Sequence, residues 1–332
     1  MRQLTLNLST GDISTLEVPA PKIQKGCLLI RTRCSLISSG TERALYNFSK
    51  SNIFNKAKSQ PDRVKEVLDK IKSDGIISTY ESVINKLDSS IPIGNSNVGE
   101  VIGIGSGVSG FKIGDRVVSN GPHSEIILVP HNLCSIIPDS VNDEEAAFTV
   151  LSSIALQGIR LSNPTFGETF LVSGLGLIGL LAVQILKANG CKVLGIDPDG
   201  KKCKLAEALG VNTFQIDENN DPLSWILDNT DGVGIDAAII TASTNSNEPV
   251  NFSAKACRQR GRIILVGVTG LDLRRDLFYK KEITFQVSCS YGPGRYDKLY
   301  EKEGKDYPLG FVRWTEKRNF ESVLKAIKNK SI

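Results

Sequence analysis

A glycine-rich turn near the middle of the chain has the residue types and spacing that bind phosphate groups. The sequence Gly174-Leu175-Gly176-Leu177-Ile178-Gly179 follows the apolar run 169–173, which reads as a strand, and precedes an apolar stretch that reads as a helix. In such a strand–turn–helix unit, free backbone N–H groups at the helix start face the negative charge of a ligand. An acid, Asp197, ends the next predicted strand. Together these features predict a dinucleotide-binding site.

Each glycine of this turn has a physical role in the prediction. Gly174 permits the tight turn, Gly176 lets the backbone approach a pyrophosphate, and Gly179 lets the helix pack closely on the strand. Asp197 would accept hydrogen bonds from the adenosine ribose hydroxyls, and its charge would repel a 2′-phosphate. The sequence therefore predicts NAD rather than NADP. The alternative interpretation is a glycine-rich turn that binds nothing.

The elements that must position this turn alternate between strand and helix from about residue 165 onward. The predicted strands are Thr169–Ser173, Lys192–Asp197, Thr213–Ile216, Ile235–Thr241, Arg262–Gly267 and Ile283–Ser288. Such alternation predicts an α/β domain with a parallel, doubly wound sheet. We assign residues 149–332 to this Rossmann domain, which binds the cofactor and carries a C-terminal extension.

The earlier part of the chain has a different character, with short strands punctuated by glycines. Residues 1–48 read as short strands, and strands return after Pro92, in a pattern that suits a small barrel or sandwich. Between them lie two helix starts, at Ser59 and Ser78, each followed by apolar residues at helical spacing. We therefore expect residues 1–148 to form a β-rich catalytic domain with a helical insertion at 50–90.

Composition and charge restrict the classes of function. The chain has 332 residues and a formal net charge of +4, without the clustered Lys and Arg that nucleic-acid binding requires. It has no apolar run long enough to span a membrane and no signal pattern at its start, which favours a cytoplasmic protein. The seven cysteines are scattered and form no Cys-x-x-Cys pair, as is typical of free thiols in a reducing compartment.

With these motifs placed, the sequence resembles the medium-chain dehydrogenase/reductase family, to which the zinc alcohol dehydrogenases belong. The resemblance is carried by the run 98–117, with its string Gly105-Ser106-Gly107-Val108-Ser109-Gly110, and by the turn at 174–179. It covers nearly the whole chain except the insertion, and it implies a GroES-like β-barrel catalytic domain beside the Rossmann domain. It also implies further cofactor contacts, at Leu177, Ile178, Lys202, Thr241, Val266, Gly267, Val268, Ser288 and Ser290.

A closer resemblance is carried by the run Ile37 to Arg43, the helical insertion and the run Ser288 to Tyr296. These are similar to bacterial two-part oxidoreductases of surface-polysaccharide gene sets, in which a second Rossmann half follows. This similarity implies a sugar or sugar nucleotide as substrate, and a homo-oligomer or a missing C-terminal oxidoreductase domain as partner. The helix expected at 320–327 is followed in the family by a segment that returns to the catalytic domain. We therefore expect an incomplete chain that self-associates or docks onto a partner.

The zinc ligands of the resembled family are replaced in this sequence. A catalytic zinc needs three protein ligands and one open position. Ser39 stands where the family has a cysteine and Asn95 where it has a histidine, and residues 147–157 contain neither cysteine nor histidine. We therefore expect no bound metal and a zinc-independent reaction.

Without zinc, another group must polarise the C–O bond of a substrate. His123 could act as general acid or base near neutral pH. Thr41 matches the hydroxyl of the family's proton relay, and Asn95 could hydrogen-bond a substrate oxygen. Structural roles, a satisfied histidine and two turn-stabilising residues, are the alternatives. The expected reaction is hydride transfer between NAD and an alcohol or carbonyl carbon. Its rivals are a non-catalytic NAD-binding module of a larger enzyme and a zinc-free quinone reductase.

Overall fold

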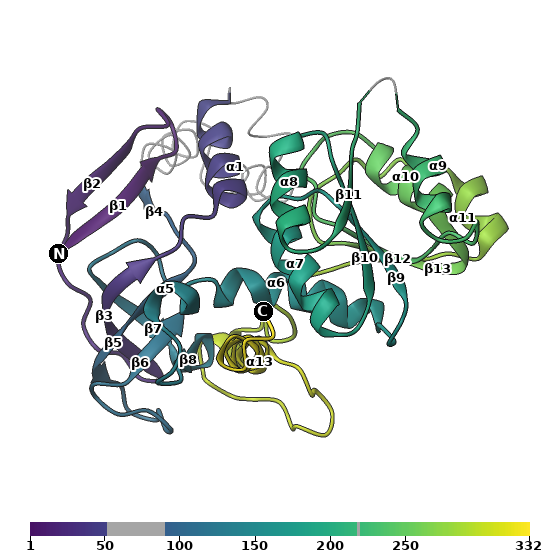
Figure 1. The fold of residues 1–332 in the computed structure, drawn as a ribbon. Helices are drawn as coiled ribbons and strands as arrows, with labels where there is room; N and C mark the ends of the chain where they lie inside the picture. The colour runs from purple at the N-terminus through teal and green to yellow at the C-terminus, as the bar shows by residue number, and fades with distance from the viewer. Residues whose placement is uncertain (52–89, 218–219) are drawn as a thin grey trace, which may run out of the picture.

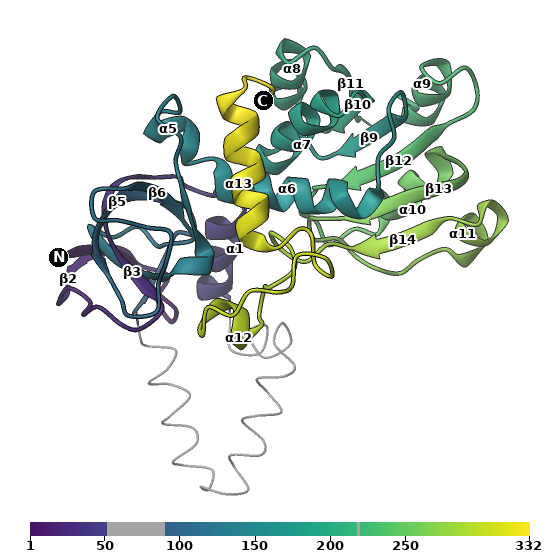
Figure 2. The same cartoon turned by 90° about the horizontal axis from the view of Figure 1, so that it is seen from below.

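The computed structural model describes residues 1–51, 90–217 and 220–332. Most of the predicted helical insertion at 50–90 lies outside the described residues. Within them, antiparallel strands occupy one side of the molecule and a parallel sheet the other, with helices α1, α6 and α13 between (Figures 1 and 2). This arrangement agrees with the predicted α/β class and its two kinds of sheet.

The N-terminal half is built on antiparallel strands, which confirms the expected β-rich character of this part of the chain. Five strands form one sheet in the order β7-β3-β5-β6-β8. Their bounds are Ile126–Pro130, Cys27–Ser35, Asn97–Ile104, Arg116–Ser119 and Cys134–Ile136, in the same order. A second sheet has the order β2-β1-β4, with bounds Ile13–Glu17, Arg2–Asn7 and Ser90–Pro92. In β3, Leu28 and Ile30 are fully buried while Arg31 is exposed, as expected for side chains that alternate between the faces of a strand.

Helix α1 (Ser39–Lys50) corrects the expectation that residues 1–48 are all short strands. Its N-cap is Ser38, and the Glu42 carboxylate accepts a hydrogen bond from the Ser38 N–H at 2.8 Å. A capping box has its acid three residues after the cap. Here the acid lies four residues after the cap, so the start of this helix lacked its usual sequence signal.

The second half is a parallel sheet with the strand order β11-β10-β9-β12-β13-β14, which is that of a doubly wound dinucleotide-binding fold. The bounds are β9 Thr169–Ser173, β10 Lys192–Asp197, β11 Asn212–Gln215, β12 Ile235–Ile240, β13 Cys257–Leu265 and β14 Thr284–Val287. The six predicted strands are thereby confirmed. In β9, Phe170 and Val172 pack into one core cluster and Leu171 into another. The strand is therefore buried on both faces, which is why its sequence is a continuous apolar run.

Helices cover both faces of this sheet (Figure 1). They are α7 Leu177–Ala188, α8 Gly200–Ala208, α9 Pro222–Asp228, α10 Glu248–Ala256 and α11 Arg275–Lys281. The remaining helices are α5 Asp143–Ala146, α6 Thr149–Ser162, α12 Lys298–Glu301 and α13 Glu316–Lys328, with a 3-10 turn at His131–Leu133.

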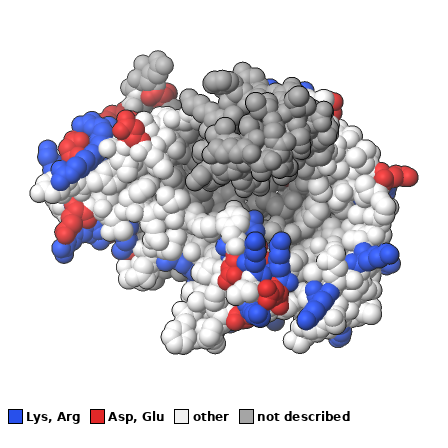
Figure 3. Space-filling view, turned by 180° about the vertical axis from the view of Figure 1, so that it is seen from behind, with Lys and Arg blue, Asp and Glu red and all other residues white. Residues whose placement is uncertain are grey.

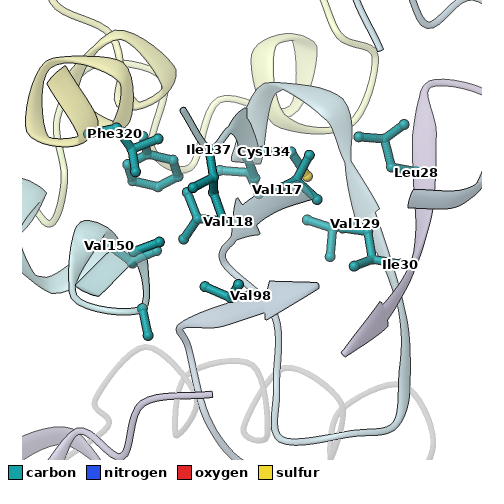
Figure 4. Packing of buried hydrophobic residues seen from close by; sticks show 14 of the residues in the cluster. Leu28, Ile30, Val98, Val117, Val118, Val129, Cys134, Ile137, Val150 and Phe320 are labelled. Carbon is teal, nitrogen blue, oxygen red and sulfur yellow. The ribbon is translucent and has the colours of Figure 1, made fainter. Parts of the chain in front are cut away.

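The last helix, α13, completes the core of the antiparallel half. Phe320 and Leu324 of this helix, and Tyr291 before it, belong to the same buried cluster as Leu28 and Ile30 (Figure 4). This packing differs from the assignment of the whole range 149–332 to the cofactor domain. The apolar face of α13 contacts the antiparallel strands, a long-range pairing that the sequence did not reveal. The boundary between residues 148 and 149 stays a prediction.

The surface and the thiols agree with the sequence analysis. Lys and Arg side chains on the rear face alternate with Asp and Glu rather than forming a continuous basic surface (Figure 3). Every cysteine is a free thiol. Among the described residues, no helix has both the length and the hydropathy needed to cross a membrane.

Candidate functional site

The glycine-rich turn between β9 and α7 is held by close backbone contacts at two of its glycines. Gly174 has a φ of 99°, and a Cβ on it would lie 2.6 Å from the backbone N of Ala242. A Cβ on Gly179 would lie 2.0 Å from the Gly174 carbonyl oxygen. Both positions therefore require glycine, because any side chain would displace backbone atoms.

Gly176 differs, because no atom lies within 4 Å of the position that its Cβ would occupy. It is the N-cap of α7, and no side chain caps this helix. The N–H groups of the first turn, which includes Leu177 and Ile178, therefore have no side-chain cap, and the space beside Gly176 is open. A pyrophosphate group fits this cradle, because free N–H groups and the helix dipole both favour an anion there.

Asp197 lies at the carboxyl end of β10, with its carboxylate fixed beside the turn. The side chain is buried, and its Oδ2 accepts a hydrogen bond from the Leu175 N–H at 2.8 Å. Its Oδ1 accepts one from the Asp199 N–H at 2.8 Å and lies 3.5 Å from Lys202 Nζ. A carboxylate can accept about four hydrogen bonds, so acceptor capacity is left for ribose hydroxyls. Asp197 and Lys202, the two predicted ribose contacts, thus lie side by side.

The residues predicted to flank the nicotinamide follow the ends of β12 and β13. Thr241 Oγ1 donates a hydrogen bond to the Gly174 carbonyl at 2.5 Å, which ties this strand end to the glycine-rich turn. A Cβ on Gly267 would lie 2.1 Å from the Ala242 carbonyl oxygen, so the segment 266–268 packs directly on the neighbouring strand end.

Ser288 and Ser290 follow the end of β14. The Ser288 N–H donates a hydrogen bond to the Leu265 carbonyl at 2.8 Å, and its buried Oγ has no partner among the described residues. Ser290 has a φ of 47°, in the left-handed region. The structure thus brings all of the predicted cofactor residues to the carboxyl edge of the parallel sheet, where ligands of doubly wound folds bind.

His123 lies between β6 and β7, and its backbone and ring are both fixed. Its N–H donates to the Ile93 carbonyl at 2.8 Å and its carbonyl accepts from the Leu4 N–H at 2.9 Å. The ring Nδ1 lies 2.7 Å from Ser35 Oγ, and Nε2 lies 3.2 Å from Glu42 Oε1. Only 9% of the side chain is exposed. The imidazole therefore connects a hydroxyl to a carboxylate.

The other two predicted catalytic residues are chain neighbours of residues that contact this ring. Thr41 precedes Glu42 on α1, and its Oγ1 accepts a hydrogen bond from Ser38 Oγ at 3.1 Å. Asn95 follows Gly94, whose missing Cβ would lie 2.7 Å from a ring carbon of His123. The Asn95 Oδ1 is buried without a hydrogen-bond partner among the described residues. The structure therefore gathers His123, Thr41 and Asn95 into one region.

One hydrogen bond joins this region to the cofactor edge. Asn120 Nδ2 donates to the Tyr291 hydroxyl, and Tyr291 directly follows Ser290. Burial raises the pKa of Tyr291, so this hydroxyl stays protonated at any physiological pH. The loop that carries His123 is thus tied to the segment that the resemblance places beside the nicotinamide.

Sequence reasoning missed Ser35 and Glu42. Ser35 lies 88 positions and Glu42 81 positions from His123 in the chain, so no local pattern links them. Only a weak sequence signal pointed to Glu42. Glu42 directly follows Thr41, and an acid in the first turn of a helix is favoured by the helix dipole in any case.

The side chains of this region do not fit a zinc ion. Both ring nitrogens of His123 are occupied by Ser35 and Glu42. Within the ranges that the structure describes, no three or more His, Cys, Asp or Glu side chains gather in a way that could hold a metal. Catalytic zinc requires three such ligands.

Comparisons with known proteins find similarity to dehydrogenases. Residues 178–302 match the family model described as Zinc-binding dehydrogenase. The D-guloside 3-dehydrogenase of Escherichia coli (strain K12) is 27% identical over 247 residues, which are 71% of this chain and 66% of that protein. The chain therefore spans slightly less than two thirds of that relative. The (R,R)-butanediol dehydrogenase of Bacillus subtilis (strain 168) is 28% identical over 176 residues, or 45% of this chain and 51% of that protein.

Solved structures share the fold over the whole chain. The 2R,3R-butanediol dehydrogenase from Bacillus subtilis matches with a TM-score of 0.71 at 20% identity, covering 99% of this chain and 88% of that one. Alcohol dehydrogenase TADH from Thermus sp. ATN1 matches with a TM-score of 0.74 at 18% identity, covering 100% and 90%. The family model over residues 178–302, the named relatives and the fold make the chain similar to dehydrogenases of the medium-chain type. They also support an oxidoreductase that uses a nicotinamide cofactor.

Proposed function

We propose that the chain is a zinc-independent, NAD-dependent oxidoreductase that transfers hydride to or from an alcohol or carbonyl carbon of a sugar. The observation that carries the proposal is the open cradle at Gly176 beside the fixed carboxylate of Asp197. The first accommodates a pyrophosphate, and the second accepts ribose hydroxyls while repelling a 2′-phosphate. The nicotinamide ring, when bound, accepts or donates the hydride.

Zinc independence is supported by the chemistry of the side chains. At the positions of the family's zinc ligands this chain has Ser39 and Asn95, an exposed hydroxyl and an amide. Neither is a ligand that zinc prefers. Asn95 Oδ1 can instead accept a hydrogen bond from a substrate hydroxyl, which would give this buried atom a partner.

A sugar or sugar nucleotide as substrate is supported by two observations of different kind. Two of the similar proteins are named D-guloside 3-dehydrogenase and sorbitol dehydrogenase. The sequence also resembles two-part oxidoreductases of polysaccharide biosynthesis at residues 37–43 and 288–296. A polyhydroxylated substrate offers the donors and acceptors that a polar pocket needs.

The proposal is tested by cofactor binding and then by turnover. Calorimetric titration should show tighter binding of NADH than of NADPH. Gly176→Val should abolish binding without unfolding the chain, because it fills the space that the pyrophosphate needs. Gly310→Val is the matched control, because that position is also open within 4 Å and lies outside the turn. Equal or tighter NADPH binding would contradict the assignment of NAD.

Turnover is followed through nicotinamide absorbance on a panel of sugars, sugar nucleotides, polyols and quinones. Oxidation or reduction of a sugar after exhaustive chelation is the expected result. Tight NAD binding without turnover on any substrate would favour the non-catalytic module. Quinone reduction with NADPH would favour the quinone reductase.

A further inference from the structure

The position of the proton on the neutral His123 ring is defined, because the two neighbours of the ring differ in chemistry. A carboxylate accepts hydrogen bonds and donates none. Nε2 must therefore carry the proton that it shares with Glu42 Oε1, at 3.2 Å. In the neutral ring Nδ1 is then the acceptor, and the Ser35 hydroxyl donates to it at 2.7 Å.

This ring cannot swing out to meet a substrate. Its backbone is hydrogen-bonded on both sides, to Ile93 and to Leu4. Gly94 packs against the ring so closely that even a Cβ there would lie 2.7 Å from it. Only 9% of the His123 side chain and 15% of the Glu42 side chain are exposed, and Ser35 at the end of β3 is half-buried. A substrate would therefore reach the ring through one of its two neighbours rather than directly.

The other end is anchored by the first turn of α1. Glu42 Oε1 accepts a second hydrogen bond, from the Ser38 N–H at 2.8 Å, and 15% of its side chain is exposed. The carboxylate is thereby held in place where it can stabilise positive charge on the imidazole. The same arrangement, a hydroxyl and a carboxylate on opposite ring nitrogens, is what general-base chemistry requires.

We propose that Ser35, His123 and Glu42 form a relay that takes the proton of the substrate hydroxyl, a role that rests on the proposed function. In alcohol oxidation the substrate C–H bond breaks, and its electron pair leaves with the hydrogen as hydride to the bound nicotinamide. The substrate O–H bond also breaks, and its proton passes to Ser35 Oγ while the serine's own proton passes to His123 Nδ1. The imidazolium is balanced by Glu42, and its Nε2 proton leaves to water through this carboxylate, which is partly exposed. Carbonyl reduction runs the same steps in reverse.

In this relay Ser35 is the catalytic residue, and His123 and Glu42 act through it. Glu42→Gln keeps the shape of the side chain but removes its charge. Its amide oxygen can still accept hydrogen bonds from the Ser38 N–H and from Nε2, so the tautomer of the ring is kept. The imidazolium formed during proton transfer then lacks its counter-charge, and we expect turnover to fall by about two to four orders of magnitude.

The first test reads the tautomers directly and needs no substrate. The chain has two histidines, so their ring nitrogens are easily assigned by ¹⁵N NMR. His123 should be protonated on Nε2. His131 should be protonated on Nδ1, because that atom lies 2.9 Å from the Gly26 carbonyl, which can only accept. Glu42→Gln should leave both tautomers unchanged, because the amide oxygen can still accept from Nε2.

The second test compares the turnover of variants with that of the wild-type chain, on the sugar substrate that the panel identifies. Ser35→Ala and Glu42→Gln should each lower kcat by about two to four orders of magnitude and flatten its pH profile, with NAD affinity unchanged. Ser35→Thr, unlike Ser35→Ala, should retain activity, because threonine also carries a hydroxyl. Glu248→Gln is the matched control, an acid in the first turn of α10 whose side chain is 66% exposed.

Two results would overturn the relay while leaving the proposed function intact. One is His123 protonated on Nδ1 in the wild-type chain. The other is a Ser35→Ala variant with the wild-type kcat and pH profile. Absence of turnover on every substrate would overturn the proposed function and the relay's chemistry with it, and the tautomers would then describe a structural histidine.

Discussion

Glu316, the first residue of α13, is expected to make the chain less stable as the pH rises. It is fully buried, and neither carboxylate oxygen has a hydrogen-bond partner among the described residues. Burial raises its pKa from 4.5 to about 8, and the charge of Glu301 adds to this effect while Arg295 opposes it. The folded chain thus keeps a proton that the unfolded chain gives up.

The sign and size of the effect follow from this difference. Between about pH 4.5 and 8 the unfolded state binds fewer protons, so the free energy of unfolding falls as the pH rises. One pKa unit corresponds to about 1.4 kcal/mol, so the loss over the whole window is about 3 to 5 kcal/mol. Below that window both states are protonated, and above it both are ionised, so the effect levels off. Glu316→Gln is neutral in both states and should remove this slope.

The assay is denaturant unfolding at a series of pH values, followed by the fluorescence of Trp314 in a Trp225→Phe background. Trp314 lies two positions before Glu316, and the chain has two tryptophans, so the signal reports the surroundings of α13. Glu321→Gln, an exposed acid on the same helix, is the matched control and should keep the wild-type slope. Parallel stability curves for the wild type and Glu316→Gln would refute the reasoning.

Three further predictions concern the site and the core. His123→Gln should lower turnover by about two to four orders of magnitude with NAD affinity intact, as stopped-flow binding and steady-state kinetics would show; near-normal turnover would exclude this ring from proton transfer. The purified chain should carry no stoichiometric zinc by elemental analysis, and one zinc per chain lost together with activity on chelation would contradict zinc independence. Phe320→Ala should lower the free energy of unfolding by about 3 to 5 kcal/mol in the same denaturant assay, because Phe320 is fully buried; a change below about 1 kcal/mol would show that the core closes without it.

The parallel half of the fold was predictable because its signals are local. A strand buried on both faces, such as β9, appears as a continuous apolar run, and the glycine-rich turn follows it directly. The contacts that require Gly174 and Gly179 lie within the same unit or its neighbouring strand. The glycine-rich turn and its place between β9 and α7 could therefore be predicted from local signals, whereas the further cofactor contacts stay predictions that the resemblance implies.

The His123 region was predictable only in part, because its chemistry comes from pairs of distant residues. The resemblance led to His123, Thr41 and Asn95, and the structure brings these together. The partners of the ring, Ser35 and Glu42, come from β3 and α1, and nothing near His123 in the sequence specifies them. The start of α1 was also missed, because its cap and its acid are spaced one residue too far apart for the usual pattern.

Tyr291 connects the two regions to α13, so stability and activity should be coupled in this chain. Its hydroxyl accepts a hydrogen bond from Asn120 in the His123 loop, and its carbonyl accepts one from Asn319 Nδ2 of α13 at 2.8 Å. Its ring packs edge-on against Phe320, with the ring centroids 5.5 Å apart. A variant that loosens α13 therefore disturbs the segment after Ser290 and the His123 loop together. For this reason Phe320→Ala should lower turnover under conditions in which the variant is still folded, although Phe320 belongs to the core of the antiparallel half.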